Sequence, residues 1–342
     1  MSDQATVTDQ DLLEGLLRSA SRTFAINIPM LPGLLRDALT LGYLLLRNAD
    51  TLEDAYRWPK ERRMAELERL HALLRHPDEQ AAQDFAARFQ AETALAPGPD
   101  LDLLRQTPYL LAELSRLPEA YTREVLSHVG RVILRMEKWV ARHDDANHLQ
   151  IERLSQLDDY CYSVAGIVGE LVTSLIALYR PALDRTRLLF LRTLETGVGA
   201  GLQLTNIIKD AFRDHLEGRN YIPPEYLPID GRGSLERMKP MFAYAYRHLC
   251  LGVDYTCALP EHEVDIRKAV FVPLLLAAAT LVHLLERIED LFAGMEVKIS
   301  RETVGSLLAL ADRSAAENRA VRRAWQEVSG PLLTLHTGLA AP

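Results

Sequence analysis

Helical periodicity extends along almost the whole chain. Apolar residues recur three and four positions apart in segment after segment, and no convincing alternation of apolar and polar residues marks a strand. The spacing predicts helices near 9–20, 33–56, 60–75, 79–94, 100–116, 119–143, 151–179, 184–217, 232–258, 263–293 and 301–328. The breaks between them are too short for a domain linker. We therefore predict an all-α chain in which residues 1–342 form a single-domain helical bundle, with a polar N-terminal tail at 1–9 and a C-terminal tail at 330–342.

Size and composition agree with a large buried core. The chain has 342 residues, of which 48% are hydrophobic and 25% are charged. The net charge of −8 argues against nucleic acid as a partner, because nucleic-acid binding uses a basic surface. Three cysteines without a CxxC pair and a polar, acidic start predict a cytoplasmic protein.

The longest apolar run is too short to cross a membrane. It covers residues 269–282, has 14 residues and contains Pro273. About 20 residues are needed to span a bilayer. We expect a buried helix here and no transmembrane segment, which leaves room for a peripheral membrane contact when the product is released.

Acidic residues directly follow the apolar run LTLGYLLL (39–46). Spacings of 4, 3 and 4 place Tyr43, Arg47, Asp50 and Asp54 along one side of a helix. Carboxylates one turn apart repel each other, and in apolar surroundings the cost rises unless a positive charge lies between them. The pattern therefore predicts a cation beside these acids.

A second apolar segment, 199–217, repeats the pattern. Gln203, Asn206, Asp210 and Asp214 share one side, spaced 3, 4 and 4 apart. One such pair alone would usually be a solvated helix face, whereas two aligned pairs favour a shared metal. Mg²⁺ prefers oxygen ligands and typically uses one or two carboxylates with water and phosphate oxygens. Basic residues suited to a diphosphate flank the pairs, namely Arg47, Lys209, Arg213 and Arg219.

The segment YCYSVAGIVGELVTSL (160–175) has different chemistry. Its spacing predicts one apolar stripe made of Tyr160, Val164, Val168 and Val172. Gly166 and Gly169 interrupt the helix at roughly 1 kcal/mol each relative to alanine, which indicates close helix packing or space for a ligand. A polar, metal-bearing mouth with a long apolar interior suits a prenyl diphosphate.

Four motifs resemble, in order, those of the squalene/phytoene synthase family, whose members join two prenyl diphosphates head to head. They are SRTF at 21–24, YLLLRNADTLED at 43–54, YCYSVAGIVG at 160–169 and QLTNIIKDAFRDHLEGRNYIP at 203–223. The resemblance covers roughly residues 14–305. It implies an all-α isoprenoid-synthase fold with a central cavity, Mg²⁺ as cofactor and prenyl diphosphates as substrates.

The resemblance also implies roles for individual residues. The metal ligands would be Asp50, Asp54, Asp210 and Asp214. The catalytic residues would be Tyr43, Tyr160 and Arg47. Substrate would be bound by Ser21, Arg22, Phe24, Val164, Val168, Leu171, Gln203, Asn206, Lys209 and Arg219. Lys209 departs from the family, where an arginine usually stands, and so lacks the bidentate fork.

DTLED (50–54) and VKISRETV (297–304) look more like squalene synthases than like phytoene synthases. The favoured reaction is condensation of two farnesyl diphosphates through presqualene diphosphate to squalene, with NADPH as the reductant. Phytoene or dehydrosqualene synthesis, from C20 or C15 substrates without a reductant, is the closest alternative. A terpene cyclase or chain elongator, and a non-catalytic descendant serving as a binding or assembly protein, are further ones. Substrate length, use of NADPH, oligomeric state and membrane attachment are left open.

Overall fold

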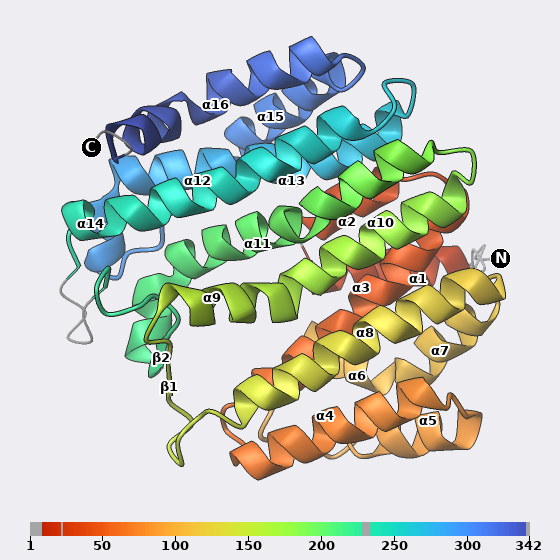
Figure 1. The fold of residues 1–342 in the computed structure, drawn as a ribbon. Helices are drawn as coiled ribbons and strands as arrows, with labels where there is room; N and C mark the ends of the chain where they lie inside the picture. Colours follow the sequence, from red (N-terminus) through yellow and green to blue (C-terminus); the bar gives the residue numbers. More distant parts are fainter. Residues whose placement is uncertain (1–8, 22, 228–232, 340–342) are drawn as a thin grey trace, which may run out of the picture. The chain divides into compact units, whose positions relative to one another are not determined.

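The computed structural model describes residues 9–21, 23–227 and 233–339, and its regular structure is almost entirely helical (Figure 1). This confirms the predicted all-α class. By their internal contacts the residues form two compact units, Met1–Ala141 and Arg142–Pro342. That they act as a single domain stays a prediction. Of the expected N-terminal tail, residues 1–8 lie outside the described part, and the first helix begins at Asp9.

The first unit is built around the helix α3 (Gly33–Glu53), which packs against α1, α4, α6, α7 and α8. Apolar side chains that recur at helical spacing cover its buried face, and Leu35, Leu44 and Leu45 are fully buried. The other helical elements of this unit are α1 (Asp9–Ala20), α2 (Phe24–Asn27), the 3₁₀ helix η1 (Ile28–Met30), α4 (Lys60–Arg75), α5 (Glu79–Ala87), α6 (Pro99–Arg105), α7 (Thr107–Ser115) and α8 (Glu119–Val140).

The second unit is built around α11 (Arg185–Leu216), a helix of 32 residues that packs against α10, α12 and α13. Asp184 begins it, because its carboxylate accepts a hydrogen bond from the backbone N–H of Arg187. The other elements are β1 (Leu149–Gln150), α9 (Leu154–Cys161), the π-helix η2 (Tyr162–Gly166), α10 (Ile167–Tyr179), β2 (Arg219–Asn220), α12 (Leu235–Ala258), α13 (Val264–Glu286), α14 (Ile288–Phe292), α15 (Arg301–Ser314) and α16 (Asn318–Leu339).

Two short strands accompany the helices in the described part of the chain. β1 and β2 pair in parallel, with Leu149 opposite Arg219 and Gln150 opposite Asn220. The sequence indicated no strand, since two residues are too few to show an alternating pattern. This pairing holds Arg219 and Asn220, which directly follow the second acidic motif, against β1.

Several predicted helices are interrupted. The predicted helix 100–116 is α6 followed by α7, and Pro108 lies at the start of α7, where its missing N–H costs least. The predicted helix 263–293 is α13 followed by α14, and 301–328 is α15 followed by α16. The helix predicted to end at residue 328 continues as α16 to Leu339, through most of the segment 330–342 that we predicted as a C-terminal tail.

A buried arginine bonds to both sides of the break between α15 and α16. The Arg267 side chain is fully buried and donates to the carbonyl oxygens of Thr256 at 2.9 Å and Leu259 at 2.7 Å, near the end of α12. It also donates to the carbonyl oxygen of Ala315 and, at 2.8 Å, to Oδ1 of Asn318. One guanidinium thus satisfies carbonyl oxygens at the ends of α12 and α15 and also bonds to the first side chain of α16. No local sequence pattern predicts these contacts.

Among the residues that the structure describes, two stretches of the second unit are long and apolar enough to cross a membrane by length and composition alone. They are Leu154–Tyr179, with 50% of its most apolar window buried, and Val264–Glu286, with 61% buried. A core helix of a soluble protein passes the same test. Within Val264–Glu286 the predicted buried run holds fully buried Phe271, Leu274 and Leu275.

Replacing Arg267 by methionine tests the helix clamp. We expect the thermal unfolding midpoint to fall by about 5 °C or more, because buried carbonyls without donors cost ~1–3 kcal/mol each. Differential scanning calorimetry measures the shift. Arg322→Met is the control, since Arg322 forms an exposed ion pair with Asp254 and should contribute little. Equal midpoints for both variants would contradict the clamp.

Candidate functional site

The first unit brings together three of the predicted residues next to α1. The Ser21 hydroxyl accepts a hydrogen bond from the backbone N–H of Phe24 at 3.0 Å. The rings of Phe24 and Tyr43 lie 4.8 Å apart, and the Tyr43 hydroxyl is 3.5 Å from the carbonyl oxygen of Ala20. Burial raises the pKa of Tyr43. Arg22 lies outside the described residues.

The guanidinium of Arg47 lies between two carboxylates. Its Nε and Nη2 donate to the two carboxylate oxygens of Asp100 at 2.9 and 2.8 Å. Its Nη1 is 3.9 Å from Oδ2 of Asp50, one turn further along α3. Arg47 therefore lies beside the first acidic motif, as predicted, but with a partner that spacing along the chain did not indicate.

The two aspartates of the first motif lie at the C-terminal end of α3. The helix was predicted to reach residue 56, but it ends at Glu53, so Asp54 is the residue just beyond it. The Asp54 backbone N–H still donates to the carbonyl oxygen of Asp50 at 2.8 Å, and the Tyr56 hydroxyl donates to its side chain at 3.0 Å. The unpaired carbonyls at a helix C-terminus carry partial negative charge, which favours a cation there.

Electrostatics at this helix end disfavour the charged carboxylates. Burial raises the pKa of Asp50 to about 7. The positive charge of Arg47 opposes this shift, whereas the negative charges of Asp54 and Asp100 add to it. Burial likewise raises the pKa of Glu53 well above its ordinary value. A bound cation would offset both effects.

The second acidic motif also ends its helix. Asp210 and Asp214 lie in the last two turns of α11, which ends at Leu216. Asp210 is 3.4 Å from Nζ of Lys209 and 3.1 Å from Nη2 of Arg213. Burial raises the pKa of Asp214 to about 6, although its bond to Arg219 opposes the shift.

Arg219 reaches Asp214 through a tight turn. Its Nη2 donates to Oδ1 of Asp214 at 2.9 Å, and both side chains are almost completely buried. Gly218 precedes it with φ of +80°, where a Cβ would lie 2.1 Å from the ring of His148. Only glycine fits there, and the β1–β2 pairing then holds Arg219 in place.

The polar residues before the second motif lie along the same helix. Asn206 is exposed, and its Oδ1 lies 3.4 Å from Nζ of Lys209. Gln203, one turn earlier, is half-buried. Gln203, Asn206, Lys209 and Asp210 therefore follow one another along α11 toward its C-terminal end, where Asp214 lies.

The central motif contains a π-helical turn that the periodicity did not indicate. Tyr160 is buried at the end of α9, with its ring 4.8 Å from that of Tyr221. The π-turn η2 follows and adds one residue to the turn, so positions on either side of it no longer share one helical stripe. Val164 and Val168 are half-buried, whereas Leu171 is buried.

The question whether the glycines of this segment mark close packing or space for a ligand is answered for Gly169, and Gly199 of α11 makes a similar contact. A Cβ on Gly169 would lie 2.0 Å from the carbonyl oxygen of Glu195, and one on Gly199 would lie 2.0 Å from that of Ala165. Gly169 therefore allows the backbones of α10 and α11 to touch, and Gly199 does the same for the π-turn and α11. Close helix packing is the structural reason for Gly169.

The chemistry of the donor set fits Mg²⁺. Among the described residues no group of three or more histidine, cysteine, aspartate or glutamate side chains is arranged to hold a metal ion. Mg²⁺ does not require one, because it commonly takes one or two carboxylates with water and phosphate oxygens. Each helix end offers such carboxylates. The predicted site residues form one group in each of the two units. That the two groups together form a single site stays a prediction.

Asp100 and Tyr221 are the residues of these two groups that sequence reasoning missed. Asp100 lies in the first turn of α6 and is separated by 53 positions from Arg47. Nothing in helical spacing connects them. Tyr221 lies within the resemblance to the second motif, so its aromatic side chain next to Arg219 was the available signal.

A pocket of about 910 Å³ lies elsewhere in the second unit. It is bordered by the turn between α10 and α11, the first turns of α11 and the turn between α12 and α13, and includes Phe190, Cys257 and Pro260. None of the predicted site residues lines it. The predicted central cavity is therefore a different feature and stays a prediction.

Together these features define an all-α protein with a carboxylate pair at the C-terminal end of a long apolar helix in each unit. A model of the family described as squalene/phytoene synthase matches residues 17–303. Because that match covers most of the chain, the protein belongs to the squalene/phytoene synthase family.

Individual relatives agree with this assignment. Squalene synthase of Schizosaccharomyces pombe is 28% identical over 284 residues, which cover 78% of this chain and 57% of that protein. Lycopaoctaene synthase of Botryococcus braunii is 29% identical over 303 residues, covering 84% and 62%. The chain thus spans little more than half the length of these curated relatives.

Solved structures confirm the fold. The chain is similar to TcSQS solved with the ligand BPH1237, with a TM-score of 0.77 at 25% identity over 95% of this chain and 92% of that one. A dehydrosqualene synthase in complex with ligand has a TM-score of 0.57 at 18% identity, which shows the fold alone. The isoprenoid-synthase type of fold predicted from the resemblance is therefore confirmed.

Replacing Gly169 by alanine tests the close approach of α10 and α11. We expect the thermal unfolding midpoint to fall, with a loss of ~1–3 kcal/mol, because backbone atoms cannot move aside as a flexible side chain could. Gly305→Ala, in the same unit, is the matched control. Gly305 is exposed on α15, and a Cβ there would have no heavy atom within 4 Å, so alanine should leave stability unchanged or raise it slightly.

Proposed function

We propose that this protein is a Mg²⁺-dependent prenyltransferase that condenses two farnesyl diphosphates head to head, through presqualene diphosphate, to squalene. One observation carries the proposal: each acidic motif lies at the C-terminal end of an apolar helix, with an arginine against it. Membership of the squalene/phytoene synthase family supports this class of reaction.

The acidic residues would hold the metal with the diphosphate. Asp50 and Asp54 on one helix end, and Asp210 and Asp214 on the other, supply hard oxygen ligands. When bound, Mg²⁺ neutralises charge on the leaving diphosphate. Arg47 and Arg219 would donate N–H groups to the diphosphate oxygens, and Lys209 would add a positive charge without a planar fork.

The apolar and aromatic residues would govern the carbon chemistry. Loss of diphosphate from one substrate leaves an allylic cation, which the double bond of the second substrate attacks, and loss of a proton closes the cyclopropane ring. Tyr43 and Tyr160 would face these cations and assist the proton transfer. Side chains that line the tails would exclude water, which otherwise converts the cations to alcohols. These are Phe24, Val164, Val168 and Leu171.

The second half of the reaction decides the product. A second loss of diphosphate and rearrangement, followed by hydride from NADPH, gives squalene, whereas loss of a proton instead gives a dehydro product. The family model covers phytoene synthases as well. Synthesis of phytoene or dehydrosqualene without a reductant is therefore the second candidate.

The proposal also covers where in the cell the protein works. We infer that it is cytoplasmic and contacts a membrane peripherally, because a C30 hydrocarbon leaves an enzyme more readily into lipid than into water.

Product analysis tests the reaction. The purified protein is incubated with Mg²⁺ and either farnesyl or geranylgeranyl diphosphate, with and without NADPH, and extracts are identified by gas chromatography–mass spectrometry. Squalene formed only with NADPH supports the proposal. A C40 or dehydro-C30 hydrocarbon supports the second candidate, and no consumption of either substrate would favour a binding protein.

Removal of single carboxylates tests the metal assignment. Asp50→Ala and Asp210→Ala should each lower turnover by roughly 10²–10³-fold or more while the far-ultraviolet circular dichroism stays unchanged. Asp37→Ala is the control. It removes a carboxylate from the same helix α3, equally 39% exposed but paired with Arg36, and should leave turnover unchanged. Near-normal turnover in either Asp50 or Asp210 variant would show that the metal assignment is wrong.

A further inference from the structure

Asp100 occupies one edge of the Arg47 guanidinium. A guanidinium has five N–H groups in a planar fork, and the bidentate bond to Asp100 uses one on Nε and one on Nη2. The remaining N–H groups belong to Nη1 and Nη2, and Nη1 lies on the side of Asp50. The orientation of the fork therefore follows from Asp100.

Asp100 is itself held in a defined place. It lies in the first turn of α6, and α6 packs against α1 and α3. Arg105, at the other end of α6, donates to the carbonyl oxygen of Phe89 at 3.1 Å and so ties α6 to the loop that precedes it.

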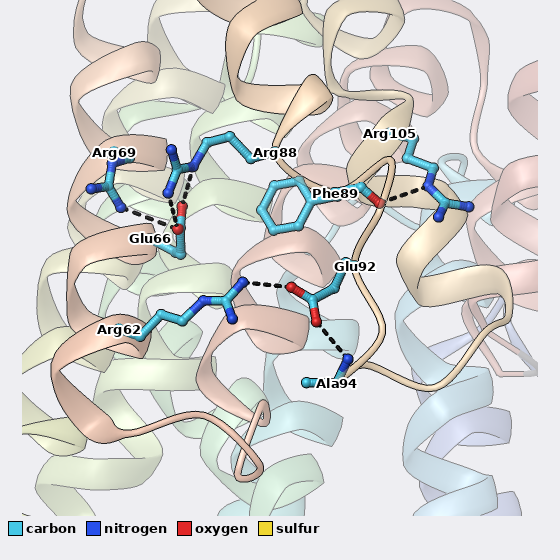
Figure 2. A network of polar contacts seen from close by, with 8 residues as sticks. All are labelled: Arg62, Glu66, Arg69, Arg88, Phe89, Glu92, Ala94 and Arg105. Carbon is cyan, nitrogen blue, oxygen red and sulfur yellow. Dashed lines mark hydrogen bonds and ion pairs between the residues drawn. The ribbon is translucent and has the colours of Figure 1, made fainter.

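That loop is clamped by charged side chains (Figure 2). Glu92 accepts hydrogen bonds from Arg62 of α4 and, at 2.6 Å, from the backbone N–H of Ala94. Its carboxylate is 6% exposed. Next to it, Arg88 donates through Nε and Nη2 to the buried carboxylate of Glu66. Both carboxylates are almost completely buried, and charge-assisted bonds to them restrict the loop more than pairs with two exposed side chains would.

We propose that Asp100 is a positioning residue that directs the free N–H groups of Arg47 toward the diphosphate of the substrate. The inference rests on the proposed function, in which Arg47 binds diphosphate and Asp50 binds Mg²⁺. Asp100 also prevents a competing arrangement. Without it, Arg47 would turn to pair directly with Asp50, since opposite charges only 3.9 Å apart attract, and would then occupy the carboxylate that the metal needs.

Isothermal titration with inorganic pyrophosphate in the presence of Mg²⁺ tests this role without relying on turnover. Asp100→Asn keeps the size of the side chain but removes its charge and one of the two acceptors. We expect it to weaken pyrophosphate binding roughly 10-fold or more, and Asp100→Glu to recover most of the loss. Asp102→Asn is the matched control, because Asp102 lies on the same helix, is 63% exposed and pairs with Arg105 rather than Arg47.

A double-mutant cycle with Arg47→Lys distinguishes positioning from a general effect. If Asp100 acts through Arg47, adding Asp100→Asn to Arg47→Lys causes little further loss of affinity. Equal losses in both backgrounds, or an Asp100→Asn variant that binds as the wild type does, would overturn the inference.

The outcomes also separate this inference from the proposed function. A wild-type protein that makes hydrocarbon while Asp100→Asn retains full pyrophosphate affinity refutes the positioning role alone. A wild-type protein that neither binds magnesium pyrophosphate nor consumes a prenyl diphosphate refutes both.

Discussion

The structure depends on carboxylates placed where a helix already carries negative charge. Asp50 and Asp54 at the end of α3, and Asp210 and Asp214 in the last two turns of α11, lie toward the helix end at which the aligned backbone dipoles carry partial negative charge. Burial adds to the conflict and raises the pKa of Asp50 to about 7 and that of Asp214 to about 6. Carboxylates at such helix ends lower the stability of the protein without a cation, and a bound cation would offset this effect. This is the physical basis of the proposed metal-dependent chemistry.

The basic residues moderate this conflict in different ways. Arg219 is buried and bonded to Asp214, and β2 and the Gly218 turn hold it there. Arg47 is instead shared between Asp50 and Asp100. The first arrangement follows from residues close in sequence. The second needs α6, whose position depends on the clamped loop of residues 88–98.

Much of the candidate site could be predicted from the sequence. Helical spacing placed Arg47 beside Asp50, and Gly169 indicated either close helix packing or space for a ligand, of which α10 and α11 show the close packing. The motif order indicated the family, which the match over residues 17–303 confirms. The π-turn at Tyr162–Gly166 could not be predicted, because an extra residue in one turn leaves no mark on a short apolar pattern.

The sequence by itself determined the all-α class, the long apolar helices and the acidic residues that follow their apolar runs, because these depend on spacing within a single helix. Only the tertiary structure decided where helices end and which distant groups meet. Arg267, 51 positions earlier, bonds to both sides of the break before Asn318, and Asp100, 53 positions later, accepts two hydrogen bonds from Arg47. Both are hydrogen bonds between groups brought together by packing, and a pattern of nearest helical neighbours contains no information about such pairs.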